Sequence, residues 1–486
     1  MKNLKLTLTM MCFMLLGIAQ HAWAVAETEP NNTWNQANVI TLGANGTGTA
    51  GLSQNQDWWR VTSTTDGKLT INFTATSGLF VRCDVYDTLG TPAVFTGSYT
   101  NGSTSFNVDG LAAGTYYIVL YAYYTTEAPT YSFTPTWTTP AQANDSEPNQ
   151  TRALAKTLTL NGATTGHVGY LYKNQRDTID WYKLTTNKDG RIDWTITSAN
   201  GLFVWATLYD NDGTTALAPS NTYTSGTGSW SVEGLAVGTY YIAVYCYYNN
   251  QFVPYTLANS LVLPAVVVDA EPNGTKAQAL NINLGDSAVG HVNYYYNHSR
   301  DTADWYKVTT TLDGQLNYSI QTYSGLYVWV TLYDNDGVTP LHAANTYTNS
   351  FGNWSDDGLA AGTYYLKVYS YYPNEYEPYK IKVSQTITPV TIDAEPNGTR
   401  ATATVINLND SITGHVGYYY NHLRDTFDYR KITLTAYGKL NWTISSQNGH
   451  YMYALLYDNN ATTLLGGNYT NGTVSYSVDG LAPGTY

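Results

Sequence analysis

Residues 325–337 read GLYVWVTLYDNDG, and residues 362–372 read GTYYLKVYSYY. In both runs apolar and aromatic residues alternate with a period of two, which predicts β-strands that bury one face and expose the other. In the first run the aromatic residues Tyr327 and Trp329 share one face, and the valines share the other. The Asp-Asn-Asp-Gly at 334–337 is typical of a tight turn after a strand. The two runs therefore predict an antiparallel, all-β protein.

The composition agrees with that fold class and argues against one kind of partner. The 486 residues include 46 Tyr, 41 Gly and 13 Trp, which are typical of strands and turns. Only 12% of the residues are charged, and the formal net charge is -13. A nucleic-acid-binding protein would show a basic stripe. We therefore expect no nucleic-acid partner.

A long internal repeat organises the chain. The GTY motif returns at Gly114, Gly238, Gly362 and Gly484, with spacings of 124, 124 and 122 residues. Solenoid repeats are shorter, at roughly 20–50 residues, so each repeat should bury a core of its own. We predict tandem jelly-roll-like β-sandwich domains, arranged as beads on a string with proline-bearing linkers. The predicted domains are β-sandwich repeats at 25–140, 141–264, 265–388 and 389–486, the last one truncated. Because repeat four stops at its GTY motif, we expect the sequence to be a fragment of a longer protein.

The first 24 residues have the pattern of a signal peptide. A basic start, MKNLK, precedes an apolar stretch, and Ala22-Trp23-Ala24 fits the cleavage rule of small residues. The mature chain should begin near Val25 and be secreted or attached to the cell surface. No later segment is long and apolar enough to span a bilayer. Cys83 and Cys246 lie at non-equivalent positions of different repeats, so we expect no disulfide between them.

Two acidic phrases recur in every repeat. An acid-x-Glu-Pro-Asn phrase opens the repeat. An Asp follows it, before two aromatic residues in repeats one to three and before Tyr429 and Arg430 in repeat four. This Asp lies 33 residues after the Glu in repeats two to four and 28 in repeat one. In repeat three the residues are Asp269, Glu271, Asn273, Asp301 and Asp304. Ca²⁺ prefers about six to eight oxygen ligands of these types, so the spacing suggests a calcium site. The alternative is that Glu-Pro-Asn is only a turn and that Asp301 pairs with Arg300 or Lys307.

The combination EPN…D-x-x-D-[WY]-[YF]…L-Y-D…G-L-x-x-G-T-Y-Y resembles the bacterial pre-peptidase C-terminal domain and the related collagen-binding domains of clostridial collagenases. The resemblance covers repeats one to three and repeat four as far as it extends, and it implies jelly-roll β-sandwiches with calcium held by acidic and amide residues. The implied ligands are Asp145, Glu147, Asn149, Asp177 and Asp180 in repeat two, Asp269, Glu271, Asn273, Asp301 and Asp304 in repeat three, and Asp393, Glu395, Asn397, Asp425 and Asp428 in repeat four. Repeat one keeps Glu27, Glu29, Asn31 and Asp57 but has Gln54 where the first Asp is expected.

The period of two also directs aromatic residues outward on the closing strands. The predicted ligand-binding residues are Tyr121, Tyr123, Tyr245, Tyr247, Tyr327, Trp329, Tyr369 and Tyr371. One interpretation is that these faces are buried by the second sheet, by a tyrosine-rich loop or by a neighbouring repeat. The other is that they form an aromatic platform for an extended ligand.

No set of residues in the sequence predicts catalysis. The chain has no HExxH motif, and Ser287 of a Gly-Asp-Ser phrase lacks a base and an oxyanion hole. The leading hypothesis is a secreted, non-catalytic protein whose calcium-stabilised modules bind or adhere to an extracellular polymer, such as a collagen-like protein or a polysaccharide. The alternatives are accessory domains of a secreted peptidase or other hydrolase whose catalytic domain lies outside this sequence, and a structural spacer on the cell surface.

Overall fold

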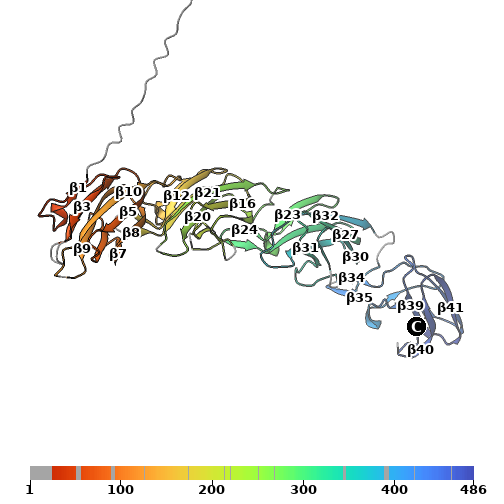
Figure 1. Ribbon diagram of the computed structural model, residues 1–486. Helices are drawn as coiled ribbons and strands as arrows, with labels where there is room; N and C mark the ends of the chain where they lie inside the picture. Colours follow the sequence, from red (N-terminus) through yellow and green to blue (C-terminus); the bar gives the residue numbers. More distant parts are fainter. Residues whose placement is uncertain are drawn as a thin grey trace, which may run out of the picture. The chain divides into compact units, whose positions relative to one another are not determined.

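The computed structural model describes residues 24–50, 56–88, 93–124, 126–172, 175–212, 214–218, 221–249, 251–267, 269–342, 346–387, 393–420, 422–460 and 462–486 (Figure 1). The predicted signal peptide, except for Ala24, and the glutamine Gln54 lie outside these residues.

The prediction of an all-β fold is confirmed. The described residues form strands, turns and short 3-10 segments, without an α-helix. None of them forms a helix of the length and apolarity that crossing a bilayer requires. The chain divides into two compact units: described residues up to Thr186, Ile192–Val232 and Gly238–Leu261 form the first, and Asn187–Arg191, Glu233–Val237 and Val262–Tyr486 form the second.

Repeat one, in the first unit, is a sandwich of two sheets with strand orders β1-β3-β10-β5-β8 and β2-β4-β9-β6-β7. Its elements are β1 (Val25–Ala26), η1 (Trp34–Gln36), β2 (Asn38–Val39), β3 (Gly46–Thr49), β4 (Asp57–Ser63), β5 (Gly67–Ala75), β6 (Val81–Tyr86), β7 (Phe95–Thr100), β8 (Ser103–Leu111), β9 (Gly114–Ala122) and β10 (Thr130–Thr138).

Most of repeat two also belongs to this unit. Its elements are η2 (Arg152–Leu154), β11 (Lys156–Leu158), β12 (Ala163–Val168), β13 (Tyr170–Tyr172), β14 (Gln175–Asp177), β15 (Ile179–Thr185), β16 (Gly190–Ser198), β17 (Val204–Tyr209), β18 (Tyr223–Thr224), β19 (Thr227–Leu235), β20 (Thr239–Cys246) and β21 (Val253–Val262).

Repeat three, in the second unit, follows the same plan. One sheet has the order β22-β26-β31-β28-β29, and the other contains β23-β32-β27-β30. The elements are η3 (Lys276–Gln278), β22 (Leu280–Asn281), β23 (Ser287–Val292), β24 (Tyr294–Tyr296), β25 (Ser299–Asp301), β26 (Ala303–Thr310), β27 (Gly314–Thr322), β28 (Val328–Tyr333), β29 (Tyr347–Thr348), β30 (Phe351–Leu359), β31 (Gly362–Ser370) and β32 (Glu377–Ile387). The predicted turn after β28 is confirmed, because the Gly337 N–H donates to the Asp334 carbonyl oxygen at 2.8 Å.

Repeat four shows a smaller set of pairings. Its elements are η4 (Arg400–Thr402), β33 (Thr404–Val405), β34 (Tyr418–Tyr420), β35 (Leu423–Asp425), β36 (Arg430–Lys431), β37 (Thr433–Leu434), β38 (Gly438–Ser445), β39 (Met452–Tyr457), β40 (Leu464–Thr470), β41 (Thr473–Leu481) and β42 (Gly484–Thr485). The pairs β33-β36, β37-β42, β38-β41 and β39-β40 are each two-stranded. Its buried cluster is small and centres on Leu434, Leu440 and Leu481.

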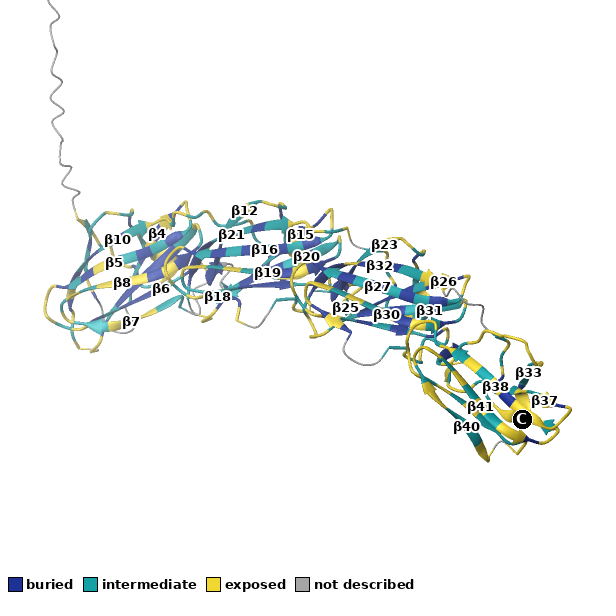
Figure 2. Cartoon of the chain, turned by 90° about the vertical axis from the view of Figure 1, so that its right-hand side faces the viewer, coloured by how far each residue is buried: buried dark blue, intermediate teal, exposed yellow. Residues whose placement is uncertain are grey.

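The core of each complete repeat lies between its two sheets. In repeat three, Val328 and Val330 of β28 pack with Leu366 and Val368 of β31, all fully buried. Figure 2 shows the alternation along the strands as bands of buried and half-exposed residues, for example on β16 and β27. The period of two therefore predicted the inward face correctly. Cys83 and Cys246 are both buried free cysteines.

The proline-bearing linkers are shorter than the sequence suggested, because the strands β10, β21 and β32 extend into them. Within each unit, moreover, a tyrosine hairpin of one repeat joins a sheet of the repeat before it. Leu171 of β13 pairs with Leu111 of β8 in the first unit, and Tyr419 of β34 pairs with Leu359 of β30 in the second. Neighbouring repeats of a unit therefore share a sheet edge as well as a linker.

Candidate metal centres and an aromatic face

The structure brings the two acidic phrases of each repeat together. In repeat three Asp269, Glu271 and Asn273 precede η3, while Asp301 ends β25 and Asp304 lies at the start of β26. Asp304 faces inward, on the same side of β26 as Tyr306 and Val308, and all three are fully buried. One carboxylate oxygen from each of Asp269, Glu271 and Asp304 lies within 4.8 Å of the others. The predicted convergence of the two phrases is therefore observed.

In repeat three, only some of the side-chain oxygens of the acidic cluster accept hydrogen bonds from the protein. Asp269 Oδ2 accepts from Asn273 Nδ2 at 2.6 Å, and Glu271 Oε2 accepts from the Asn273 N–H at 3.0 Å. Tyr379 donates its hydroxyl to Asp304 Oδ2. The remaining oxygens have no hydrogen-bond partner although they are buried: Asp269 Oδ1, Glu271 Oε1, Asn273 Oδ1, Asp301 Oδ2 and Asp304 Oδ1. Five oxygens from five residues are thus left available.

Repeat two reproduces this pattern atom by atom. Asn149 Nδ2 donates to Asp145 Oδ2 at 2.5 Å, and the Asn149 N–H donates to Glu147 Oε2 at 3.1 Å. The buried oxygens without a partner are Asp145 Oδ1, Glu147 Oε1, Asn149 Oδ1, Asp177 Oδ2 and Asp180 Oδ1. Unpartnered buried polar atoms are uncommon in folded proteins and need an explanation. The repetition of the same five in a second repeat points to a common ligand.

The electrostatics of these clusters also call for a cation. Burial, followed by the carboxylates of Asp301 and Asp269, raises the pKa of Glu271 to about 8. In repeat two burial and the carboxylates of Asp177 and Asp145 likewise raise the pKa of Glu147 to about 8. Several buried carboxylates this close together repel each other, and desolvation disfavours their charged forms. A bound cation would remove both penalties.

Two tyrosines and a histidine behind the cluster were missed by the sequence reasoning. Tyr306 and Tyr379, both fully buried, join their hydroxyls at 2.8 Å, and Tyr306 donates to Asp269 Oδ2 at 3.5 Å. His291 is also fully buried, with Nδ1 at 3.5 Å from Asp269 Oδ1. The Tyr pair spans 73 residues, so no local pattern could have revealed it. The alternative pairing of Asp301 with Arg300 receives no support, because Arg300 Nη1 donates to the carbonyls of Asn293 and Glu233.

Repeat one has a related cluster with different bonding. Glu27, Glu29 and Asp57 come together, and Asp57 is fully buried. Glu27 replaces the aspartate of the other repeats, and its two oxygens accept from the Thr49 N–H at 2.6 Å and from the Tyr131 hydroxyl at 3.0 Å. Burial and the neighbouring Glu27 raise the pKa of Asp57 to about 8.

Repeat four assembles Asp393, Glu395 and Asp428 but adds a cation of its own. The Arg430 guanidinium forms an ion pair with Asp393 and lies 3.6 Å from Asp428 Oδ2. In repeats two and three this position is a tyrosine, Tyr182 or Tyr306. The sequence contained the signal, since the phrase reads DYR in repeat four and DWY in the other two.

The outward face of the β28 and β31 sheet carries a stack of aromatic rings. Trp329 and Tyr369 are cross-strand partners, and their ring planes differ by 8° at a centroid distance of 6.2 Å. Tyr371 lies parallel to Trp329 within 3°, at 5.4 Å. Tyr347 contacts Trp329 at 4.8 Å with the ring planes tilted by 57°, and Tyr327 contacts both Tyr347 and Tyr371. We call Tyr327, Trp329, Tyr347, Tyr369 and Tyr371 the aromatic ladder of repeat three.

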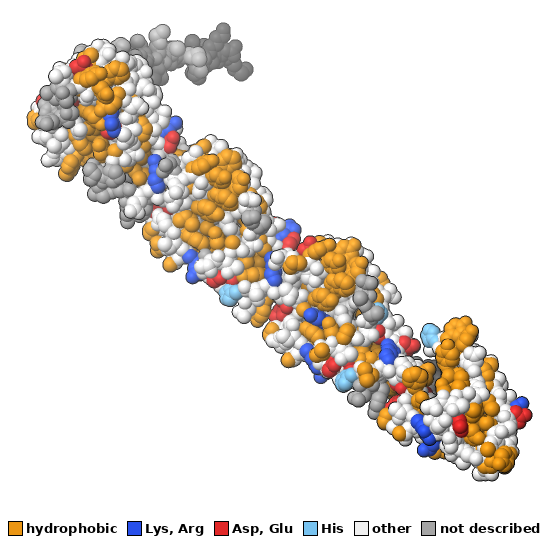
Figure 3. Space-filling view, turned by 90° about the horizontal axis from the view of Figure 1, so that it is seen from below, with side chains coloured by type: hydrophobic (Ala, Val, Ile, Leu, Met, Phe, Trp, Pro, Cys, Tyr) orange, Lys and Arg blue, Asp and Glu red, His pale blue; other side chains and the backbone are white. Residues whose placement is uncertain are grey.

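The equivalent face of repeat two carries the same ladder. Trp205 is parallel to Tyr245 and to Tyr247 within 5° and 6°, at 5.7 Å from each, and Tyr223 contacts Trp205 at 4.7 Å. Figure 3 shows hydrophobic side chains, which include tyrosine, gathered in broad areas on the surfaces of the repeats.

In repeat one an arginine takes the central place of the ladder. Arg82 lies over the rings of Tyr99 and Tyr121, at 5.6 and 5.5 Å from their centroids, and pairs with Asp84 at 2.9 Å. Tyr123 contacts Tyr99 at 4.6 Å. The face is therefore still aromatic but carries a positive charge at its centre.

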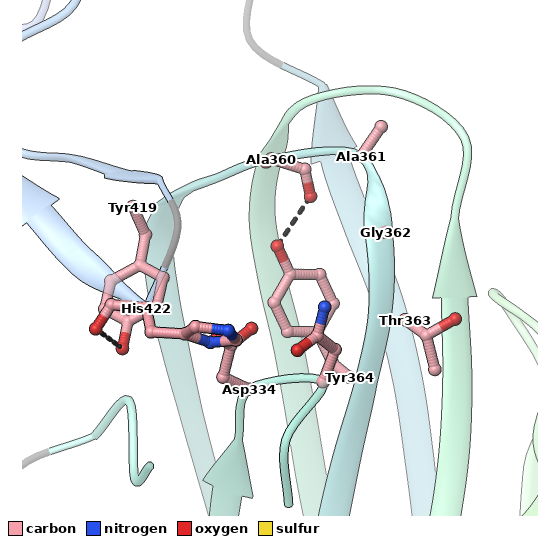
Figure 4. Close-up of a pocket in the computed structure, with 9 residues that line it drawn as sticks. Asp334, Ala360, Ala361, Gly362, Thr363, Tyr364, Tyr419 and His422 are labelled. Atoms are coloured by element: carbon pink, nitrogen blue, oxygen red, sulfur yellow. Dashed lines mark hydrogen bonds and ion pairs between the residues drawn. The ribbon is translucent and has the colours of Figure 1, made fainter. Parts of the chain in front are cut away.

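A pocket of the second unit was not predicted from the sequence (Figure 4). Asp334, Tyr364, Tyr419 and His422 line it together with Asn335 and the backbone of 360–363. Asp334 forms an ion pair with His422, and Tyr364 donates to the Ala360 carbonyl oxygen at 2.6 Å. The lining supplies one carboxylate and one imidazole, which are bonded to each other. The acidic clusters therefore remain the stronger candidate sites.

No protein-family model and no curated protein sequence matches the chain. Among solved structures, the pre-peptidase C-terminal domain of a collagenase from Bacillus anthracis is 19% identical, with a TM-score of 0.18, over 24% of this chain and 100% of that one. The M60 catalytic domain with the CBM51-1 and CBM51-2 domains of ZmpB from Clostridium perfringens is 8% identical, with a TM-score of 0.15, over 68% of this chain and 33% of that one. The CBM22-1-CBM22-2 tandem of Xyn10C from Paenibacillus barcinonensis is 10% identical, with a TM-score of 0.15, over 46% of this chain and 92% of that one. Similarities this low do not assign a function.

Proposed function

We propose that the chain is a secreted, non-catalytic array of β-sandwich modules that bind an extracellular polymer, and that Ca²⁺ stabilises the modules. The observation that carries the binding function is the aromatic ladder on the outward sheet face, present in both repeat two and repeat three. The signal-peptide pattern of residues 1–24 supports export.

The exposure of the ladder supports a binding role over a packing role. Tyr327, Tyr347 and Tyr371 are 39%, 41% and 40% exposed, respectively. Val330 and Val368, on the opposite side of the same strands, are fully buried against the second sheet. A core position would favour aliphatic residues, whereas Tyr and Trp suit a recognition surface, because they offer a large contact area with little side-chain entropy to lose.

The stacking of the rings limits what the ladder can contact. Three tyrosine rings pack against Trp329: Tyr369 and Tyr371 lie parallel to it, and Tyr347 is tilted by 57°. The side chains of Tyr327, Tyr347 and Tyr371 remain exposed and present ring carbons and hydroxyl groups. Such a surface suits an extended ligand with both apolar groups and hydrogen-bonding groups, which describes a collagen-like protein or a polysaccharide. Tandem ladders would add avidity on a polymer even where each contact is weak.

The acidic clusters of repeats two and three fit calcium best. The available oxygens of repeat three come from four carboxylates and one amide, with no sulfur. Ca²⁺ takes about six to eight oxygen ligands, and water can complete such a shell. Zn²⁺ commonly prefers nitrogen or sulfur donors in a tetrahedral arrangement. When bound, Ca²⁺ supplies two positive charges to a cluster that otherwise repels itself. Asp269, Glu271 and Asn273 would then hold the start of the repeat against Asp301 and Asp304.

Calorimetric titration of the mature chain, residues 25–486, tests the metal part. We expect calcium binding at millimolar or lower concentration, with one site lost in Glu271→Gln and one in Glu147→Gln. Glu233→Gln is the matched control, because Glu233 is an exposed acid paired with Arg191 outside the clusters. If no calcium binds, or if the Glu233 variant loses as much as the other two, the metal assignment is wrong.

Retention on insoluble collagen, chitin, cellulose and peptidoglycan tests the binding part. We expect the mature chain to be retained on at least one polymer and the Tyr369→Ala/Tyr371→Ala variant to bind roughly threefold to fivefold more weakly, because central aromatic residues dominate such interfaces while repeat two keeps its own ladder. Tyr437→Ala is the control, since Tyr437 is highly exposed but lies outside the ladders. Equal retention of both variants, or no retention on any polymer, would contradict the proposal and favour a structural spacer.

A further inference from the structure

Arg430 occupies a structurally equivalent place to a buried tyrosine of the other repeats. Tyr306 of β26 pairs with Leu280 of β22, and Tyr182 of β15 pairs with Lys156 of β11. In repeat four the same parallel pairing joins Arg430 of β36 to Thr404 of β33. The tyrosines point at the first aspartate of their cluster through a hydroxyl. Arg430 directs its positively charged guanidinium at the corresponding aspartate of repeat four, Asp393.

The guanidinium is built into the cluster rather than lying on the surface. One terminal nitrogen, Nη2, contacts Asp393 Oδ2 and lies 3.6 Å from Asp428 Oδ2. The other terminal nitrogen, Nη1, donates to the Thr404 hydroxyl. The Arg430 side chain is 19% exposed, and those of Asp393 and Asp428 are 9% and 15% exposed. Partial burial strengthens an ion pair of this kind relative to one in open solvent.

The set of available oxygens also differs between the two repeats. In repeat three Asp269 Oδ1 has no hydrogen-bond partner. In repeat four both oxygens of Asp393 are engaged, because Oδ1 accepts from the His415 N–H at 3.1 Å and Oδ2 accepts from Arg430 and Asn397. The buried oxygens left without a partner are Glu395 Oε1, Asn397 Oδ1, Asp425 Oδ2 and Asp428 Oδ1. A metal ion would meet one fewer available oxygen and a fixed positive charge.

We propose that Arg430 is an internal cation that takes the place of calcium in repeat four. This inference rests on the proposed function, in which repeats two and three bind calcium. Arginine keeps its charge at any physiological pH and makes directed bonds to carboxylates. Repeat four therefore holds its acidic cluster together without a metal and binds Ca²⁺ at least roughly tenfold more weakly than repeat three, because the two cations repel each other.

The consequence is that the repeats differ in how much their stability depends on calcium. When calcium is scarce, repeats two and three lose the ion that neutralises their clusters, while repeat four keeps its own neutralising charge. The array would then respond to calcium in its middle and not in its fourth repeat.

Counting calcium sites in the mature chain, residues 25–486, tests this directly. We expect Glu395→Gln to leave the number of tight sites unchanged, while Glu271→Gln lowers it by one. Loss of a tight site in Glu395→Gln would overturn the inference while leaving the proposed function intact. If Glu271→Gln removes no site, the proposed function itself fails.

A second measurement does not depend on calcium binding. In chelator, Arg430→Gln should speed hydrogen exchange in β38 and β41 of repeat four and lower its unfolding temperature by roughly 5 °C, because the acidic cluster loses its counter-charge. Arg430→Lys should lose less. Exchange in β27 and β32 of repeat three is the internal control and should not change. If Arg430→Gln exchanges like the wild type in chelator, Arg430 does not neutralise the cluster, and the inference is wrong.

The reverse substitution completes the test. Tyr306→Arg should abolish the calcium site of repeat three, while Tyr306→Phe, which removes only the hydroxyl, should retain it. Retention of the site in a folded Tyr306→Arg protein, as judged by unchanged exchange in β27, would overturn the inference.

Discussion

Repeats one and three arrange the same strands around the same two surfaces, but single residues give these surfaces different chemistry. In repeat three, Asp269 leaves one oxygen without a hydrogen-bond partner. In repeat one, the longer side chain of Glu27 reaches both the Thr49 N–H and the Tyr131 hydroxyl, so protein donors engage both of its oxygens. The side chain of Glu27 is one methylene group longer than that of Asp269, and both of its carboxylate oxygens accept hydrogen bonds from the protein.

The outward faces differ in the same way. Trp329 is stacked parallel to two tyrosine rings in repeat three, whereas Arg82 lies over two tyrosine rings in repeat one and pairs with Asp84. The inward residues of both repeats keep an aliphatic and aromatic core. The comparison teaches that the core preserves the fold while the outward and cluster positions vary in chemistry.

The largest expected difference concerns folding of the separate repeats. A fragment of residues 265–388 should fold on its own with calcium and lose much of its strand content in chelator, because its acidic cluster then repels itself. A fragment of residues 25–140 should respond less to chelation. Circular dichroism during thermal unfolding, with and without calcium, checks both. A single unfolding transition of the whole chain, with no folded fragment, would contradict the predicted domain boundaries.

The next largest effect is expected when the buried aspartate of the cluster is replaced in repeat three or in repeat one. Asp304→Asn should remove the stabilisation by calcium in repeat three, about 2.7 kcal/mol when calcium is at a hundred times its dissociation constant. Asp57→Asn should leave the response of repeat one to calcium almost unchanged. Hydrogen exchange of β27 and β5, measured in calcium and in chelator, gives the two free energies of opening. An equal calcium-dependent loss in both variants would erase the distinction between the clusters.

A smaller effect is expected from the tyrosines behind the clusters. Tyr379→Phe deprives the buried carboxylate of Asp304 of its donor, which should lower the free energy of unfolding by about 2 kcal/mol, as for hydrogen bonds to charged groups. Tyr131→Phe removes the donor to Glu27, bonded at 3.0 Å, and the acceptor of the Trp59 indole N–H, bonded at 2.9 Å. Because Glu27 is only half-buried and keeps the Thr49 N–H as a donor, this variant should cost less, about 1 kcal/mol. Denaturant unfolding of the two fragments measures both. The reverse order of the two losses would show that the first repeat depends more on its cluster than the third.

The smallest effect concerns polymer binding by the outward sheet faces of repeats three and one. Trp329→Arg should weaken retention on the bound polymer by a few-fold, because it removes the centre of one ladder while repeat two keeps its own. Arg82→Trp should leave retention equal or improve it. Comparison of the two variants on the same polymer is the measurement. If Trp329→Arg strengthens binding, the charge of repeat one, and not the ladder, marks the binding face.

The sequence alone determined the features that depend on neighbouring residues. Alternation of apolar and polar positions specified the inward faces of strands such as β28, because side chains of a strand point to opposite sides in turn. The repeated Glu-Pro-Asn and Asp phrases identified Asp269, Glu271 and Asp304 as one cluster, because their spacing recurs.

The tertiary structure decided what depends on residues far apart in the chain. The Tyr306 and Tyr379 hydroxyls meet across 73 residues, and Tyr419 of repeat four pairs with Leu359 of repeat three. Which oxygen of each carboxylate remains without a partner, and how far Arg430 reaches into its cluster, follow from the way two sheets pack. That packing sets side-chain directions through contacts that no local pattern encodes.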